Sequence, residues 1–488
     1  MLEINRLLAR LPGRPLVSPP GIDAVAARAG RYRTQRQVRL ASAALALVTV
    51  LGVVQLAGAE DREVDRLRTA GTPAGPDGSD VTLPPGLDEL VNGSSTTTTT
   101  ADVGGGSTTT STTAQPGGGG GNGKPAPCPS GQNAGATDVG VTGDRITIVS
   151  RGPGLGVKAA AQRVNRQGGI CGRRIDVQTN DSPSFPPAGD YFAMVPGVAD
   201  TAASHEGLTT PVVGGEGWSH QEYGSGWSWP VGTSAAAQVR IMVTHAHESG
   251  AKTFGMVHDS GRPWGTQAAD AFRAKVKALT GADPKAVVGL QPGKAGYTGE
   301  AQSFNEQCGC DFVAFAMLPD TALNYLASQS EGKGFGTMLT GTMTPLFNDR
   351  FARDCGPKCD RLHVWTPYNP PIGRFAGNPD VAAYVEDLRA ITPTADATNQ
   401  VIEREYVGAR VLIAALERVG ANLTRDRLRA ELDALRFSSG LTSTLDWGPS
   451  VPADRFANRS AQAFRVRTAS GSFAGFEEVG TGLRRDPS

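Results

Sequence analysis

Two hydrophobic patterns alternate from Thr137 to Ser488, and this alternation constrains the fold more than any other feature of the chain. One pattern is a short apolar run rich in β-branched residues, which is typical of a buried strand. The other is a longer stretch with apolar residues at helical spacing. Strands are predicted where the runs ITIVS, FGMVHD, AVVGL, DFVAFAM and TMLTG begin, at Ile146, Phe254, Ala286, Asp311 and Thr337.

Helices are predicted between and after these strands. Repeated strand and helix units give parallel sheets covered by helices on both faces. Roughly 350 residues are too many for one such core, so we predict an α/β fold of two lobes. The helices are expected at 157–166, 235–247, 267–279, 298–307, 321–330, 379–391, 398–419 and 424–435, and a strand-like stretch closes the chain at 464–479.

The composition indicates that only part of the chain is packed structure. The 488 residues include 63 Gly and 33 Pro. Together these two residue types make up roughly a fifth of the chain, whereas they make up roughly 12% of an average protein. The 47 basic side chains are balanced by 47 acidic ones, whereas a nucleic-acid-binding protein needs an excess of Lys and Arg to neutralise phosphates. We therefore expect no nucleic-acid partner.

An uncharged run of twenty residues, LASAALALVTVLGVVQLAGA from Leu40 to Ala59, matches the thickness of a bilayer core. Arginines cluster before the run and acidic residues follow it, which places the N-terminus in the cytoplasm. A cleaved signal peptide is the alternative, but the basic region is nearly forty residues long and the run exceeds a signal sequence. We predict a disordered Arg-rich cytoplasmic tail at 1–37, one transmembrane helix at 38–59 and a main domain outside the cell membrane.

The segment 60–136 is of low complexity, with runs such as STTTTT and GGGGG. Such a segment cannot bury enough apolar surface to offset its chain entropy. We predict an extracytoplasmic linker here, and a folded domain at 137–488.

All six cysteines follow the apolar run, and their even number outside the membrane favours disulfides. Six cysteines allow fifteen pairings. The spacing suggests Cys128 with Cys171, Cys308 with Cys310 in CGC, and Cys355 with Cys359 in CGPKC. Zinc ligation by the CxC and CxxxC pairs is the alternative, but an oxidising compartment argues against it, so no metal is expected.

Several motifs of this domain resemble leucine/isoleucine/valine-type periplasmic binding proteins. AQRVNRQGGICGRRIDVQTND (Ala161–Asp181) is similar to the family signature that joins the first helix to the second strand. The other motifs, in order along the chain, are GVTGDRITI at Gly140, TPVVG at Thr210, HDSGRPWGTQAADAFR at His258, CDFVAFAMLPDTALNYLASQSEGKG at Cys310 and EYVGARVLIAALERVG at Glu405. The resemblance spans nearly all of 137–488.

This resemblance implies a type I solute-binding fold, in which two α/β lobes are joined by three crossing strands and close on a ligand. The crossings are expected near 231–234, 365–367 and 438–442. Lobe one then comprises about 137–232 and 366–438, and lobe two about 233–365 and 439–488. Ligands bind at the carboxyl ends of the strands of such sheets.

Tryptophans gather in the loops expected at the cleft, notably Trp218 in GEGWSHQEYGSGWSWP and Trp264 in RPWG. Flat aromatic faces bind rings, sugars or cations by stacking. Trp227 and Trp229 are interpreted as packing beneath the first crossing. The start of the helix near Val157 could favour an anionic group. Where relatives carry an acidic residue for the ligand ammonium, this chain has Thr342, so a free branched-chain amino acid is not the expected ligand. The candidate ligand-binding residues are Trp264, Trp218, Asp200, Thr201, Glu216, Ser219, Asp259, Arg262, Met317 and Thr342.

An enzyme is the minor alternative. GLGVKA at Gly154–Ala159 with Asp181 fits a dinucleotide-binding pattern, but that pattern also suits a turn and a strand end in the binding fold. The sequence therefore predicts no catalytic residues and no cofactor.

The resemblance implies a membrane-tethered solute-binding protein that captures a small molecule, with a permease of the ABC class as its partner. A ligand sensor or protein-interaction module built on the same fold is the alternative function.

Overall fold

The computed structural model describes residues 128, 133–180, 190–196, 209–329, 339–360, 362–447, 457–480 and 482–487, all within one compact unit of the chain. The predicted cytoplasmic tail, the membrane span at 38–59 and most of the linker lie outside these residues. Within the described ranges, no helix is both long and apolar enough to cross a membrane.

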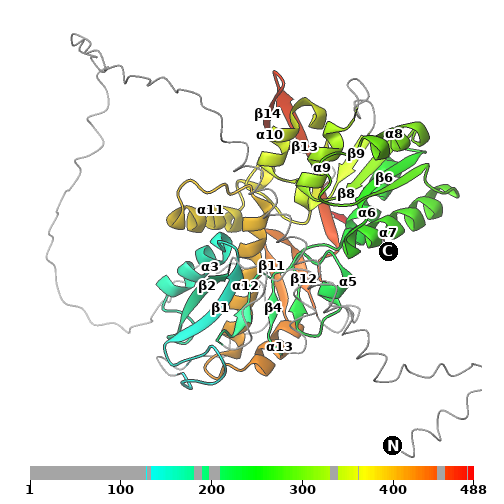
Figure 1. Ribbon diagram of the computed structural model, residues 1–488. Helices are drawn as coiled ribbons and strands as arrows, with labels where there is room; N and C mark the ends of the chain where they lie inside the picture. Colours follow the sequence, from blue (N-terminus) through cyan, green and yellow to red (C-terminus); the bar gives the residue numbers. More distant parts are fainter. Residues whose placement is uncertain are drawn as a thin grey trace, which may run out of the picture. The chain divides into compact units, whose positions relative to one another are not determined.

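The first sheet is parallel and has the strand order β2-β1-β3-β4-β5. Four helices accompany it, three of them from a distant part of the sequence (Figure 1). We call this unit lobe one. Its strands are β1 (Arg145–Arg151), β2 (Arg174–Asn180), β3 (Ala193–Met194), β4 (Val212–Val213) and β5 (Ser228–Trp229). Its helices are α3 (Leu155–Arg166), α11 (Pro379–Ile391), α12 (Gln400–Val419) and α13 (Arg425–Asp433).

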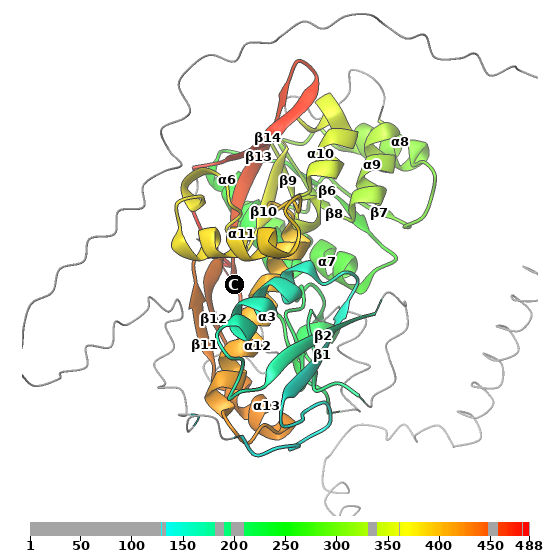
Figure 2. The ribbon, with the colours of Figure 1, turned by 90° about the vertical axis from the view of Figure 1, so that its left-hand side faces the viewer.

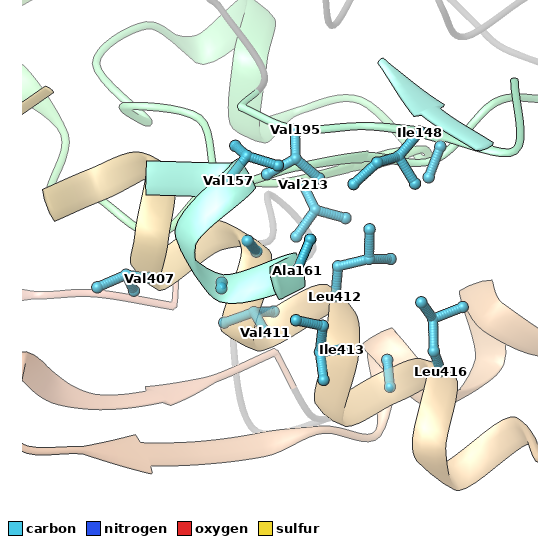
Figure 3. Close-up of a cluster of buried hydrophobic side chains, with 14 of the residues drawn as sticks. Ile148, Val157, Ala161, Val195, Val213, Val407, Val411, Leu412, Ile413 and Leu416 are labelled. Atoms are coloured by element: carbon cyan, nitrogen blue, oxygen red, sulfur yellow. The ribbon is translucent and has the colours of Figure 1, made fainter. Parts of the chain in front are cut away.

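Helix α12 is buried along most of its length because it packs between the sheet, α3 and the hairpin described below. Figure 3 shows Val411 and Leu412 of this helix beside Ala161 of α3, with Leu416 further along the helix. The helix reaches the sheet where two glycines meet, since a Cβ on Gly408 would lie 2.5 Å from the Cα of Gly214. A side chain at either position would force the helix away from β4.

The second sheet has the order β14-β13-β10-β9-β8-β6-β7, with β15 paired to β13. The strands from β7 to β10 pair in parallel, whereas β13 pairs antiparallel with both β10 and β14. The sheet that was expected to be parallel is therefore mixed at one side. We call this unit lobe two. Its strands are β6 (Phe254–Asp259), β7 (Ala286–Leu290), β8 (Phe312–Ala316), β9 (Leu339–Thr342), β10 (His363–Thr366), β13 (Ser460–Ala469), β14 (Ser472–Glu478) and β15 (Arg484–Arg485).

Helices cover both faces of the second sheet, as the alternating pattern predicts. Apolar residues of α6 and α7 pack on one face, and those of α8, α9 and α10 pack on the other. Figure 2 shows α10 near the β13–β14 hairpin, whose strand β14 it contacts. The bounds are α6 (Ala235–Glu248), α7 (Pro263–Thr280), α8 (Thr298–Gln307), α9 (Pro319–Ala327) and α10 (Asp349–Cys355).

Three segments cross between the lobes and are joined by buried side chains. Asn458 Nδ2 donates to the carbonyl of Val231 at 3.0 Å and to Thr442 Oγ1 at 3.0 Å. Thr442 Oγ1 in turn donates to the carbonyl of Pro367 at 2.9 Å. One asparagine therefore connects residues near the first, second and third crossings.

The third crossing lies further along the chain than the expected 438–442. That stretch holds the turn of an antiparallel hairpin, β11 (Arg436–Ser439) with β12 (Thr442–Asp446). Leu441 and Leu445 pack in the core of lobe one, so the hairpin stays there and the chain reaches the second sheet only at β13.

Three disulfides use all six cysteines in the pairing that the spacing suggested. They join Cys128 to Cys171, Cys308 to Cys310 and Cys355 to Cys359. The first ties the start of the described domain to a residue three positions before β2, and the other two lie within lobe two.

Candidate functional site

The loop after β4 in lobe one contacts the segment after β6 in lobe two, both at the carboxyl ends of parallel strands. Lobe one contributes the turn from β1 into α3, the loop after β4 and the first turns of α12. Lobe two contributes the loops after β6, β8 and β9. The carboxyl ends of parallel strands are where open α/β sheets bind ligands, so this junction is the candidate site.

The two tryptophans predicted as ligand platforms contact each other. Trp218 follows β4 in lobe one, and Trp264 lies in the first turn of α7 in lobe two. Their ring centroids are 5.3 Å apart, with the ring planes tilted by 57°. Beside them, the amide of His220 donates to Gln267 Oε1 at 3.0 Å, within the same contact between α5 (His220–Tyr223) and α7. A solute bound between these two loops would lie against this tryptophan pair or separate the two rings.

The loop before Trp218 is anchored to α12 by an ion pair. Glu216 bonds to Arg404, and both side chains are largely buried. Burial lowers the pKa of Arg404 to about 10, so its guanidinium remains charged at neutral pH. Ser219 is also buried, at the start of α5. The charge of Glu216 is therefore neutralised by Arg404, a residue of the same lobe.

The N-terminus of α3 is occupied by a carboxylate of the protein itself. The amide of Gly156 donates to Glu405 Oε2 at 3.0 Å, and Glu405 is only 4% exposed. A Cβ on Gly156 would lie 2.2 Å from the carbonyl oxygen of Ile402, so α3 and α12 meet without room for an inserted group. The expectation of an anion at this helix start is therefore wrong, as is the dinucleotide pattern, because Glu405 takes the donor that a phosphate would use.

A buried polar chain runs from the second crossing into the first turn of α12. Thr366 Oγ1 bonds to Gln400 Oε1, and Gln400 Nε2 donates to Glu403 Oε2 at 2.8 Å. Tyr368 joins this chain because its amide donates to Thr366 Oγ1 at 3.2 Å. Burial raises the pKa of Glu403 well above its ordinary value, although hydrogen bonds from Gln400 and from the backbone of Asn369 oppose this rise.

Asp259 and Arg262 have a structural role in lobe two. Asp259 Oδ2 accepts from the amide of Leu318 at 3.2 Å, at the start of α9, and lies 3.8 Å from Arg262 Nε. Burial raises the pKa of Asp259, and the bonds from Leu318 and Thr321 and the charge of Arg262 oppose this rise. The carboxyl group therefore connects β6 to the helix of the neighbouring strand.

Met317 and Thr342 are fully buried inside lobe two, after β8 and at the end of β9. Asp200 and Thr201 lie outside the described residues. Trp227 and Trp229 belong to the core of lobe one, where Trp229 Nε1 donates to Asp433 Oδ1 at 2.9 Å. Of the predicted candidates, the structure brings together Trp218 with Trp264, and Asp259 with Arg262.

The sequence did not reveal the acidic turn of α12 as part of the site. Glu403, Arg404 and Glu405 form the only run of three charged residues in a helix that is otherwise buried and mostly apolar. Charged residues on a buried helix need partners. A run of three charged residues in an apolar helix is therefore the sequence signal by which these residues could have been identified as candidates. The part of the chain that the structure covers contains no group of three or more His, Cys, Asp or Glu side chains suited to a metal ion.

Two α/β lobes joined by three crossing segments, with the strand ends of both sheets meeting at the junction, define a bilobal solute-binding protein. A family model described as periplasmic binding protein matches residues 188–472. The match covers more than half of the chain, so the protein belongs to the periplasmic binding protein family. No curated protein sequence matches the chain.

Solved structures share this fold at low sequence identity. The fatty acid ABC transporter substrate-binding protein from Thermomonospora curvata is 16% identical, with a TM-score of 0.59 over 70% of this chain and 93% of its own. An ABC transporter solute-binding protein from R. palustris, solved with 4-hydroxybenzoate, is 14% identical, with a TM-score of 0.58 over 70% and 98%. A substrate-binding periplasmic protein from Ralstonia solanacearum is 17% identical, with a TM-score of 0.55 over 66% and 98%.

Proposed function

We propose that this protein captures a small solute between its two lobes and delivers it to an ABC-type permease, while one N-terminal helix holds it at the outer face of the cell membrane. The observation that carries the proposal is the junction of strand ends from both sheets at three crossing segments, in a chain of the periplasmic binding protein family. The neighbours that share its fold include ABC transporter substrate-binding proteins.

Two features support the location. The run Leu40–Ala59 is long enough for a bilayer, and arginines precede it. The three disulfides agree with an oxidising compartment. Protease added to intact cells should therefore digest the folded domain and leave the N-terminal tail protected. Cleavage after Ala59 in the mature protein, seen by mass spectrometry, would contradict the anchor.

Solute capture requires no bond to be made or broken. A solute that prefers the closed arrangement shifts the lobes toward closure by its differential affinity. We place Trp218 and Trp264 at the mouth of the site, with Glu216 and Ser219 near them in lobe one; Asp200 and Thr201 stay candidates from the sequence alone. Asp259, Arg262, Met317 and Thr342 shape the lobe-two wall from within.

A thermal-shift screen of the full-length chain against a broad solute library tests the proposal. A ligand at a hundred times its Kd stabilises a protein by about 2.7 kcal/mol, which is a measurable rise in Tm. At least one solute should raise the Tm in a concentration-dependent way. A library that covers amino acids, sugars, organic acids and amines without any shift would contradict solute capture.

A further inference from the structure

We propose that the site selects solutes that carry a positively charged N–H donor group, such as a primary ammonium, and rejects carboxylates. The receptor for this group is the acidic first turn of α12, with Glu403 and the hydroxyl of Tyr368 as its contacts. This inference deepens the proposed function and rests on it.

The lobe-one side of the junction carries four carboxyl side chains and one guanidinium. Glu216, Glu222, Glu403 and Glu405 are placed here by the loop after β4, by α5 and by α12, together with Arg404. Glu216 pairs with Arg404. The amides of Gly217 and Gly156 donate to Glu222, at 2.8 Å, and to Glu405, at 3.0 Å. Glu403 lies in the first turn of α12, and no ion pair with a cation is found for it among the described residues.

Two polar atoms in this cluster lack partners. Glu403 Oε1 and the hydroxyl of Tyr368 have no hydrogen-bond partner among the described residues, although both side chains are fully buried. The two residues are linked through Gln400 and Thr366, and the carboxylates of Glu403 and Glu222 both raise the pKa of Tyr368 in addition to its burial. A buried polar atom without a partner is costly. An ammonium has three donors and no acceptor, and a cation beside Glu403 would favour the charged carboxylate that burial disfavours.

The same surroundings are unfavourable for an anion. The α3 N-terminus, which would otherwise attract a carboxylate, already bonds Glu405. The guanidinium of Arg404 is neutralised by Glu216. In lobe two, Arg262 lies beside Asp259. A solute carboxylate would therefore meet further carboxyl groups and no uncommitted cation among these residues.

Matched solutes test the charge preference directly. We would titrate the full-length chain by calorimetry with 4-hydroxybenzylamine, 4-hydroxybenzyl alcohol and 4-hydroxybenzoate, and with butylamine, butanol and butyrate. Within each series the skeleton is constant and only the head group changes. In at least one series the amine should bind at least tenfold more tightly than the alcohol, and the carboxylate should bind most weakly.

Variants identify the receptor. Glu403→Gln should weaken amine binding at least tenfold and leave alcohol binding within about twofold, because a charge–charge interaction is replaced by a neutral contact. Tyr368→Phe keeps the ring and should weaken the amine about threefold to tenfold. Glu417→Gln, on the exposed side of the same helix, is the control and should change neither affinity. Circular dichroism confirms that each variant is folded.

The outcomes separate the inference from the function on which it rests. Tightest binding by a carboxylate, or equal binding by amine and alcohol, would overturn the charge preference while supporting solute capture. An amine preference that survives both Glu403→Gln and Tyr368→Phe would overturn the assigned receptor. If no solute of either series binds and the broad library also produces no shift, both the inference and the proposed function fail.

Discussion

Trp218 of lobe one and Trp264 of lobe two meet with their ring centroids 5.3 Å apart, across the junction that carries the candidate site. An aromatic pair of this kind contributes about 0.5–1.5 kcal/mol beyond its buried area. Trp218→Ala should therefore lower the free energy of unfolding by about 1 kcal/mol in a denaturant titration. Trp229→Ala, at a fully buried position, should cost about 3–5 kcal/mol. An equal loss of unfolding free energy in the two variants would contradict the position of Trp218 outside the fully buried core.

The buried carboxylate of Asp387 in lobe one accepts bonds from three side chains. It accepts from Arg163 at 2.7 Å, from Arg166 at 3.1 Å and from the hydroxyl of Tyr406 at 2.8 Å. It thereby joins α3, α11 and α12. Asp387→Ala leaves these donors unpaired and should destabilise the protein by about 3–5 kcal/mol. The exposed pair of Asp270 with Arg273 is the control, since Asp270→Ala should cost less than about 1 kcal/mol.

The disulfides should differ in their contribution because their loops differ in length. Cys128 and Cys171 are separated by 43 residues, whereas Cys355 and Cys359 are separated by 4. The chain-entropy relation gives about 4 kcal/mol for the longer loop and about 2 kcal/mol for the shorter one. Paired Cys→Ser variants, compared by denaturant titration, should follow this order. The reverse order would show that loop closure does not determine their contribution.

His363 should make the fold sensitive to acid. Burial lowers the pKa of His363 to about 4, and His245 and Arg465 add to this lowering. The unfolded chain, with a pKa near 6.5, then binds more protons than the folded one between about pH 6.5 and 4. Stability is therefore complete above pH 6.5 and decreases as the pH falls toward 4, by on the order of 3 kcal/mol.

Unfolding measured across this pH range tests the histidine. His363→Gln should flatten the slope, while His247→Gln, at an exposed position, should leave it unchanged. Burial also lowers the pKa of His245 and of His258, so a residual slope in the His363 variant should become smaller when His245 is replaced as well. A slope equal to that of the wild type in His363→Gln would contradict the prediction.

Much of the fold could be predicted because its elements carry strong local signals. Helices α8 and α11 have the predicted bounds. In α11, Asn378 caps the first turn and Pro379 follows it, which is a common helix start. By contrast, α10 has only seven residues and too few turns for a clear period. The stretch 438–442 was expected to be a crossing from the family resemblance, and only the packing of Leu441 and Leu445 in lobe one shows that it belongs to the hairpin β11–β12.

The candidate site was less predictable because its contacts join distant parts of the chain. Loop position identified Trp218 and Trp264 as neighbours of the junction, but their mutual contact depends on how two separate loops pack. Gly156 and Glu405 are 249 residues apart, and nothing in either local segment indicates the other. A helix start looks like an anion site in sequence until the side chain that fills it is known.

The disulfide between Cys128 and Cys171 determines how mechanical load enters the folded domain. Cys171 lies three residues before β2, at the outer side of the first sheet, so a pull on the N-terminal residues is transmitted covalently to lobe one. The other two disulfides close within lobe two and transmit no such pull. If an N-terminal anchor holds the chain, as proposed, lobe one is the lobe tied most directly to it, and lobe closure is then a movement of lobe two relative to the membrane.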